Sequence, residues 1–337
     1  MAGEPLPESL AAEGRAMRRA LAADFAAALG SKTRVVVALD SRLPFEDGPW
    51  TVIRLEPDPG LDQIKEIAGR ADYTLVVAPE TMGALERVTL AIGETATRPL
   101  GSSAEAVALT ADKAALGRWF ERHGIQTPPS RVVEPARGLP ANWTYPAVLK
   151  PIDGAGSVDT LRIDDPNRLP DGARGLVAGL LQPLVAGEAK SAVFLISPAR
   201  GARLLAIGEQ RIEVREGQFT YRGGALPTPC PEAAAILTRA VEAVPGLCGF
   251  IGVDFLWDAD RGEAIVLEIN PRPTTSCVGL CHVLSPGLLA DAWMAAFSDP
   301  GRWDGLINQI INEINGAPVV RFEADGRVFP AGMGDGC

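Results

Sequence analysis

The stretch Ile265–Ser276, IVLEINPRPTTS, places three polar side chains at the end of an aliphatic segment. Glu268, Asn270 and Arg272 follow one another at every second position. Because alternate side chains of a β-strand share one face, we expect Glu268 and Asn270 to point to the same side of a sheet. Prolines flank Arg272, so we expect this side chain to leave the strand pairing and to reach beyond the other two.

A second strand precedes this stretch and predicts its partner. FIGVDFLWD (250–258) is separated from EAIVLEINP (263–271) by ADRG, a sequence typical of a β-hairpin turn. The hairpin would bring Asp254 beside Glu268 and Asn270. Three oxygen-bearing side chains at one place predict a site for Mg²⁺, with Mn²⁺ as an alternative, because such ions combine a few protein oxygens with water and phosphate ligands. The alternative is a set of polar residues at an exposed strand end.

Two lysines are candidate phosphate ligands. Lys150 ends the predicted strand PAVLK, and the loop DGAGS (153–157) follows after two residues. Small residues in this loop would let backbone N–H groups approach an anion. Lys113 lies in the first turn of a helix predicted over 110–124, where a cation opposes the helix dipole and a nearby anion would account for it. A surface lysine beside an ordinary turn is the alternative in both cases.

The first hundred residues have a different pattern. Aliphatic strands alternate with amphipathic helices, which is typical of a parallel sheet covered by helices. The predicted strands cover 33–40, 50–56 and 73–80, and the predicted helices cover 6–29, 61–71 and 81–94. Asp40 and Glu80 end two of the strands, at the edge where such sheets bind ligands. No G-x-G-x-x-G motif is present, so the pattern does not predict a dinucleotide site.

Charge and composition exclude several classes of function. The formal net charge is −10 and no block of Lys and Arg occurs, so nonspecific nucleic-acid binding is not expected. The acidic first ten residues do not resemble a secretory signal. Residues 273–290 are free of charge but contain prolines and glycines, so no membrane span is predicted. Five sparse cysteines favour reduced thiols and a cytoplasmic location.

The order of these features along the chain, two lysines, a small-residue loop and the carboxylate hairpin, resembles that of the ATP-grasp superfamily over residues 104–297. The resemblance implies a fold of α/β and α+β parts in which two α+β subdomains clamp ATP, behind a Rossmann-like α/β domain. The implied domains are an N-terminal α/β domain (1–103), an ATP-grasp lid subdomain (104–186) and a C-terminal subdomain with the metal hairpin (187–337). Members join a carboxylate to an amine or a similar nucleophile through an acylphosphate.

The resemblance also implies roles for individual residues. The ATP phosphates would be bound by Lys113, Lys150, Asp153, Gly154, Ala155, Gly156 and Ser157. In QPLVAGE (182–188), the backbone of Leu184 and Val185 would contact the adenine and Glu188 the ribose, while Gln182 stands where the family often has an acid. Asp254, Glu268 and Asn270 would hold the metal, and the transferred phosphoryl group would meet Lys150, Asn270 and Arg272.

A second resemblance concerns the substrate. FTYRGGALP (219–227) together with LEINPRPTTSCVGL (267–280) is similar to the tyramine–glutamate ligase family of methanofuran biosynthesis. It implies small-molecule substrates: glutamate, activated on its side-chain carboxylate, and an aromatic amine. Candidate substrate contacts are Arg211, Arg222, Gly223 and Thr275, and Gly223 with Gly224 would leave room for a substrate.

Two alternatives and one question stay open from the sequence. The first alternative is an ATP-dependent carboxylase that activates bicarbonate. The second is a nucleotide-binding regulatory protein without turnover, against which the complete set of charged residues argues. The sequence does not fix the oligomeric state, and a homodimer is one option.

Overall fold

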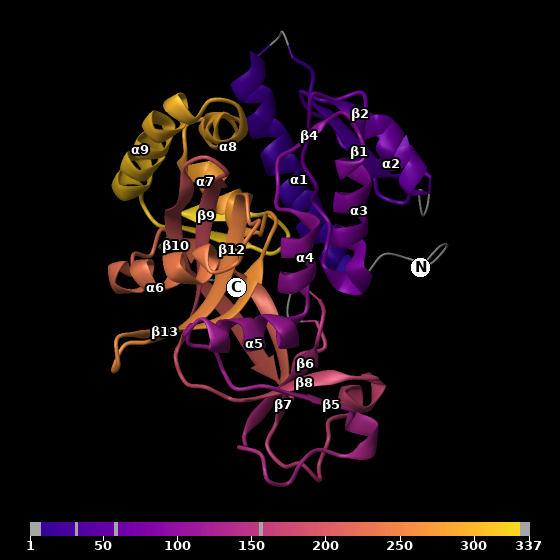
Figure 1. Ribbon diagram of the computed structural model, residues 1–337, viewed down its shortest axis with the longest axis vertical. Coiled ribbons are helices and arrows are strands. Elements are labelled where there is room, and N and C mark those ends of the chain that lie inside the picture. The colour runs from indigo at the N-terminus through magenta and orange to yellow at the C-terminus, as the bar shows by residue number, and fades with distance from the viewer. Residues whose placement is uncertain (1–7, 31–32, 57–59, 155–157, 331–337) are drawn as a thin grey trace.

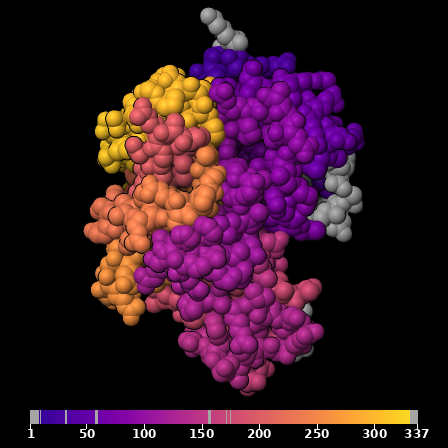
Figure 2. All heavy atoms as spheres, in the orientation of Figure 1, coloured from indigo at the N-terminus to yellow at the C-terminus, as the bar shows by residue number. Residues whose placement is uncertain are grey.

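The computed structural model describes residues 8–30, 33–56, 60–154 and 158–330. Figure 1 shows three parts: an N-terminal unit on one side, a C-terminal unit with its helices on the other, and a small group of strands at the far end. In Figure 2 the atoms of the N-terminal and C-terminal units meet directly on the visible face. The predicted combination of an α/β unit with α+β units is therefore observed.

The N-terminal unit contains short parallel strand pairs between helices. Its elements are α1 (Glu8–Leu29), β1 (Val36–Asp40), β2 (Thr51–Leu55), α2 (Leu61–Ala68), β3 (Tyr73–Thr74), η2 (Thr81–Gly83), α3 (Ala84–Gly93) and β4 (Arg98–Pro99). Strand β1 pairs with β2, and β3 with β4, both in parallel. The strand predicted over 73–80 is shorter than expected, because its only strand partner among the described residues, β4, pairs with Tyr73 and Thr74 alone. Leu75 and Val77, beyond the end of β3, still pack against the hydrophobic core.

Two short helices replace the single helix predicted over 110–124. They are α4 (Ala104–Ala111) and α5 (Lys113–Arg122). The hydroxyl of Thr110 donates to the Ala106 carbonyl inside α4 at 2.8 Å, so Thr110 does not cap the second helix. Asp112 is the N-cap of α5, and its carboxylate accepts the Ala115 N–H at 2.8 Å. Lys113 is thus the first residue of α5.

One large, mostly antiparallel sheet runs through the rest of the chain. Its order is β13-β12-β9-β10-β11-β7-β6-β8-β5, with β14 beside β11 and β15 beside β14. The bounds are β5 (Arg131–Val133), β6 (Ala147–Pro151), β7 (Leu161–Ile163), β8 (Gly179–Pro183), β9 (Glu188–Ser197), β10 (Gly201–Arg215), β11 (Gln218–Leu226), β12 (Gly249–Asp258), β13 (Glu263–Asn270), β14 (Val320–Glu323) and β15 (Val328–Pro330). Two 3₁₀ turns lie between β5 and β8 along the chain: η3 (Pro135–Arg137) and η4 (Asp171–Gly175). The sequence of residues 175–181, GLVAGLL, predicts a helix, and this prediction is wrong. Gly175 ends η4, and residues 179–181 belong to strand β8, which pairs with both β5 and β6.

Helices cover both faces of the sheet. They are α6 (Pro231–Glu242), α7 (Ser276–Val283), α8 (Leu288–Ser298) and α9 (Pro300–Gly316). Val193 and Leu195 of β9 belong to a core with α1, α7, α8 and α9, whereas Ala192 and Phe194 belong to a second core with α5 and α6. Strand β9 therefore supplies alternate side chains to two cores, as the strand period requires.

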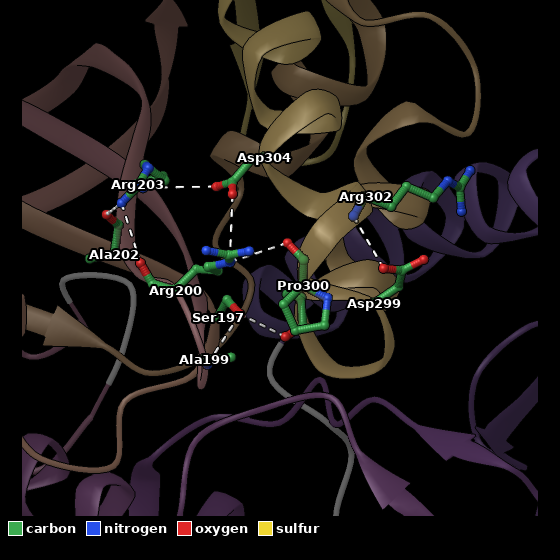
Figure 3. Close-up of polar contacts among 10 residues, drawn as sticks. Ser197, Ala199, Arg200, Ala202, Arg203, Asp299, Pro300, Arg302 and Asp304 are labelled. Atoms are coloured by element: carbon green, nitrogen blue, oxygen red, sulfur yellow. Dashed lines mark hydrogen bonds and ion pairs between the residues drawn. The ribbon is translucent and has the colours of Figure 1, made fainter.

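Figure 3 shows how the end of the β9–β10 hairpin is attached to α8 and α9. Arg200 and Arg203 approach Asp304 at 3.5 and 3.9 Å, and the buried Ser197 hydroxyl donates to the Ala296 carbonyl at 2.8 Å. The ion pairs are partly exposed, so we expect each to contribute less than the buried hydrogen bond. Asp299 caps α9 by accepting the Arg302 N–H.

Within the described ranges, no single helix is long and apolar enough to cross a membrane. The apolar helices α7 and α8 would reach that length only together, but they are bent by 108° relative to each other.

A buried aspartate joins the first helix to the C-terminal helices. Asp24 of α1 is 5% exposed, and its carboxylate accepts the N–H groups of Gly287 and Ala290 at 2.6 and 2.8 Å. These are backbone donors at the start of α8 that have no partner within the helix. Asp24 therefore caps α8 from a segment more than 260 positions earlier in the chain.

We predict that Asp24→Ala lowers the free energy of unfolding by about 2–3 kcal/mol, because it leaves buried N–H groups without an acceptor. Urea denaturation measures the effect. The exposed cap Asp299 is the matched control, and Asp299→Ala should cost about 1 kcal/mol. Equal losses for the two variants would contradict the buried-cap account.

Candidate functional site

Two carboxylates lie opposite each other on the β12–β13 hairpin. Asp254 and Glu268 are direct cross-strand partners, and both are half-buried. Asn270, the next residue on the same face of β13, donates from Nδ2 to Asp254 Oδ2 at 3.2 Å. The hairpin and the common face of these side chains agree with the sequence prediction.

Gln210 of β10 is a member of this cluster that the sequence did not indicate. Its Nε2 donates to Asp254 Oδ1 at 2.8 Å. Because β9 lies between β10 and β12, Gln210 must reach across a strand, and no spacing in the sequence predicts such a contact. Asp254 therefore accepts hydrogen bonds from two amides, which hold its carboxylate in place.

Lys113 connects the carboxylates to the loop after β6. Its Nζ donates to the Gly154 carbonyl at 2.7 Å and lies 3.3 Å from Glu268 Oε2. Its own N–H donates to the Ile152 carbonyl at 3.1 Å. The start of α5, the loop after β6 and the hairpin thus meet at one side chain.

Lys150 lies within electrostatic range of Lys113 and the two carboxylates. Burial lowers its pKa to about 8, Lys113 adds to this effect, and Glu268 and Asp254 oppose it. Two lysines and two carboxylates therefore share one electrostatic environment. Lys113 and Lys150, which are 37 positions apart in the sequence, lie within electrostatic range of each other.

The two carboxylates differ in their affinity for protons. Burial and the neighbouring Glu268 raise the pKa of Asp254 well above its usual value. Burial would also raise the pKa of Glu268, but Lys113 and Lys150 outweigh it and lower that pKa. A divalent cation would remove the repulsion between the carboxylates.

The donor set fits a divalent cation such as magnesium. Among the residues described here, no group of three or more His, Cys, Asp or Glu side chains could hold a metal ion. Asp254 and Glu268 provide two carboxylates, and Asn270 adds an amide oxygen if its Nδ2 contact with Asp254 is exchanged. Magnesium commonly takes only one or two carboxylates and keeps water and phosphate oxygens as its other ligands.

Arg272 lies beside this cluster and is paired with the N-terminal unit. Its Nε and Nη2 donate to the two carboxylate oxygens of Glu80, each at 2.8 Å, and both residues are buried. Its Nη1 donates to the Pro273 carbonyl at 3.0 Å. Arg272 leaves the strand pairing as predicted. Because two of its guanidinium nitrogens are bound to Glu80 in this structure, contact with a phosphoryl group would require Arg272 either to exchange Glu80 for that group or to use its remaining N–H donors.

The predicted phosphate loop is also attached to the N-terminal unit. Asp153 Oδ2 accepts the N–H of Met82 at 2.8 Å. Gly154 has a φ of +133°, which favours glycine. The remaining predicted loop residues, Ala155, Gly156 and Ser157, lie outside the described residues.

The predicted adenine hinge is partly occupied by the chain itself. The Leu184 N–H donates to the Pro146 carbonyl at 2.9 Å, so Leu184 retains only its carbonyl for a base. Val185 lies just beyond β8, and the side chain of Gln182 is buried near the Pro128 carbonyl at 3.5 Å. An adenine would thus be recognised mainly by Val185 and the Leu184 carbonyl.

The predicted ribose residue has a neighbour that the sequence did not indicate. The Glu188 carboxylate is exposed and lies 3.0 Å from the Nζ of Lys190, which is 6% exposed. A lysine inside the apolar strand AKSAVFLIS is a signal that could have identified it. Lys190 fixes the position of Glu188.

The four predicted substrate contacts have different surroundings. Arg211 Nη2 donates to Glu323 at 2.5 Å, and the exposed Arg222 pairs with Glu213 at 2.8 Å. The buried Thr275 hydroxyl lies 2.7 Å from the Tyr221 hydroxyl. These arginines therefore already have protein partners.

Gly223 does not leave room for a substrate, and this expectation is wrong. A Cβ at this position would lie 2.0 Å from the Phe322 carbonyl oxygen of β14. The residue also has a φ of +116°. Glycine is needed here because β14 approaches the backbone of β11 closely.

Two family models match this chain. Residues 110–276 match the ATP-grasp domain, and residues 33–107 match the pre ATP-grasp 3 domain. The second match covers much of the N-terminal unit, and the first contains the hairpin, both lysines and Arg272. Glu13 and the rest of α1 lie before both matches.

Two curated relatives carry the same name. A tyramine–L-glutamate ligase of Methanocaldococcus fervens is 27% identical over 63% of this chain and 62% of its own length. One of Methanocaldococcus jannaschii is 28% identical over 62% of this chain and 58% of its own length. The matches thus span less than two thirds of each relative.

Solved structures share the fold. An ATP-grasp superfamily protein of Archaeoglobus fulgidus has a TM-score of 0.65 at 21% identity, covering 96% of this chain and 89% of its own. An L-amino acid ligase of Bacillus licheniformis has a TM-score of 0.61 at 18% identity, covering 78% of this chain and 68% of its own. At these identities the likeness concerns the fold. The expected fold is confirmed, and the chain belongs to the ATP-grasp superfamily, with a pre-ATP-grasp domain ahead of its ATP-grasp domain.

Proposed function

We propose that this protein is an ATP-dependent ligase that joins a carboxylate to an amine through an acylphosphate. The observation that carries the proposal is the pairing of Asp254 with Glu268 across the hairpin, with Lys113 bridging from Glu268 to the Gly154 carbonyl. This arrangement provides a cation site and phosphate-binding lysines within one cluster. Phosphoryl transfer depends mainly on such positioning and charge neutralisation.

The charge of each residue in the cluster determines its proposed role. Lys113 and Lys150 would bind phosphate oxygens, because a lysine acts as a compact positive charge. Asp254 and Glu268, with Asn270, would hold magnesium, which would neutralise charge on the phosphates. Gln210 would keep the Asp254 carboxylate oriented.

Arg272 would stabilise the charge that develops when the substrate carboxylate attacks the γ-phosphorus. An oxygen–phosphorus bond forms, ADP leaves, and an acylphosphate results. The amine then attacks the acyl carbon and phosphate leaves. The pairing of Arg272 with Glu80 would hold the guanidinium beside the reacting groups before they bind.

For the substrates, we propose an amino acid such as glutamate and an aromatic primary amine such as tyramine. The names of the two curated relatives support this choice. The Tyr221–Thr275 hydroxyl pair and Arg211 provide polar groups near the hairpin, because Tyr221 lies within electrostatic range of Asp254 and Arg211.

We predict that Glu268→Gln lowers kcat/KM for ADP formation by at least about 100-fold, because it removes one carboxylate from the cation site. A coupled ADP assay over a series of Mg²⁺ concentrations measures the change. Glu263→Gln is the matched control, because Glu263 lies on the same strand and contacts only Gln126 at the surface among described partners. Similar activities of the two variants would refute the metal assignment.

We predict that Lys150→Met raises the Kd for ADP about 10- to 100-fold, as expected for the loss of a charge-assisted contact. Isothermal titration calorimetry gives this value directly. The partly exposed Lys65, which pairs with Glu94 at 2.5 Å and lies far from the proposed site residues in the sequence, supplies the control Lys65→Met. An unchanged Kd in Lys150→Met would mean that Lys150 does not contact the nucleotide.

Hydroxylamine trapping tests the proposed intermediate. With L-glutamate, ATP and hydroxylamine, we expect ADP and a hydroxamate in equal amounts, and with tyramine in place of hydroxylamine we expect the amide. ADP formation that requires bicarbonate would instead support a carboxylase. Nucleotide binding without ADP release over a panel of acids and amines would support a regulatory protein.

A further inference from the structure

Met82 of the N-terminal unit has a backbone conformation that residues other than glycine rarely adopt. Its φ is +54° and its ψ is +27°, in the left-handed region. Its side chain is 65% exposed, so side-chain packing does not account for this conformation. The contacts of its backbone do, because the N–H donates to Asp153 Oδ2 at 2.8 Å and the carbonyl accepts from Arg87 Nη1. A strained residue that is held by partners on both sides suggests that these contacts have a function.

The turn that contains Met82 touches two parts of the proposed site. It is closed by the Gly83 N–H, which donates to the Glu80 carbonyl at 3.0 Å. The side chain of Glu80 binds Arg272 at the end of the hairpin. Thr81, the next residue, lies beside Gly154, where a Cβ would be 4.0 Å from Thr81 Oγ1. The turn therefore contacts the predicted phosphate loop through Thr81 as well as through Met82.

Asp153 lies between two residues that Lys113 contacts. The Lys113 ammonium donates to the Gly154 carbonyl at 2.7 Å, and the Lys113 N–H donates to the Ile152 carbonyl at 3.1 Å. The same ammonium lies 3.3 Å from Glu268 Oε2, and the Lys113 side chain is only 10% exposed. A shift of the backbone at Asp153 would therefore move the carbonyl that holds the Lys113 ammonium.

The charge of Asp153 does not suit a direct contact with a nucleotide. A carboxylate repels a phosphate group, because like charges disfavour each other at short range. The hydrogen bond with the Met82 N–H requires only an acceptor oxygen, which an asparagine side chain also provides. The two roles can therefore be separated by substitution.

We infer that Met82 and Asp153 are positioning residues for Lys113. The Met82 N–H fixes Asp153, and the adjoining Gly154 carbonyl then fixes the Lys113 ammonium where it meets the nucleotide phosphates. This inference rests on the proposed function, in which Lys113 binds those phosphates. It gives the N-terminal unit a part in nucleotide binding, although the proposed phosphate and metal ligands all lie in the rest of the chain.

The test is calorimetric titration of Asp153→Ala and Asp153→Asn with ADP in the presence of magnesium. We expect Asp153→Ala to raise the Kd for ADP about fivefold or more, because it removes the acceptor for the Met82 N–H. Asp153→Asn keeps an acceptor and should restore the Kd to within about twofold of wild type. Asp164→Ala is the matched control, since Asp164 is an exposed aspartate that pairs with Arg162 at 2.8 Å.

A double-mutant cycle tests whether Asp153 acts through Lys113. In a Lys113→Met background, Asp153→Ala should change the Kd for ADP by less than about twofold, because substitutions that disrupt one contact are not additive. Hydrogen exchange of the peptide 79–85 gives a readout on Met82 itself. Exchange should be slower in wild type than in Asp153→Ala, and ADP should slow it further in wild type, since coupling between two sites is reciprocal.

The outcomes separate this inference from the proposed function. Equal ADP affinities of wild type and Asp153→Ala would overturn the inference, and so would a full effect of Asp153→Ala in the Lys113→Met background. Equally weak binding by Asp153→Ala and Asp153→Asn would also overturn it, because the charge would then be the requirement. In each of these cases wild type still binds ADP and the proposed function stands, whereas a wild-type protein that binds no ADP would contradict both. Thermal unfolding verifies that each variant is folded at the temperature of the titration.

Discussion

The opposition of Asp254 and Glu268 across the β12–β13 hairpin is the constraint on which the rest of the site depends. Like charges directly opposite in a sheet destabilise it, and burial increases the cost. Lys113 contacts Glu268, and amides of Gln210 and Asn270 contact Asp254. Under the proposed function, this repulsion would be relieved by a cation, and the cation and the phosphate groups would be stabilised at the same place.

The Arg272–Glu80 pair connects this site to the N-terminal unit. It is buried and has two parallel hydrogen bonds, so loss of either partner would leave an uncompensated charge. Met82, two residues after Glu80, donates to Asp153 of the phosphate loop. The segment after β3 thus contacts both the hairpin end and that loop, so the N-terminal unit contacts two parts of the proposed site.

The sequence predicted the parts of the fold and the site that depend on local spacing. The hairpin turn and strand period place Asp254, Glu268 and Asn270 together, and the alternation of strands and helices indicates the N-terminal unit. Contacts between distant strands could not be predicted, as for Gln210. Gly223 was misinterpreted because the approach of β14 is a tertiary contact. Residues 179–181 form a strand and not a helix because two neighbouring strands pair with them.

Electron paramagnetic resonance of Mn²⁺ tests the cation site most directly, since it detects the metal without turnover. In the presence of ADP, wild-type protein should bind Mn²⁺, and Asp254→Asn should weaken that binding about tenfold or more, because one anionic ligand is lost. Asp258→Asn, on the same strand but at the surface turn, should bind like wild type. Equal Mn²⁺ binding by all three proteins would contradict the assignment of the opposed carboxylates as the metal site.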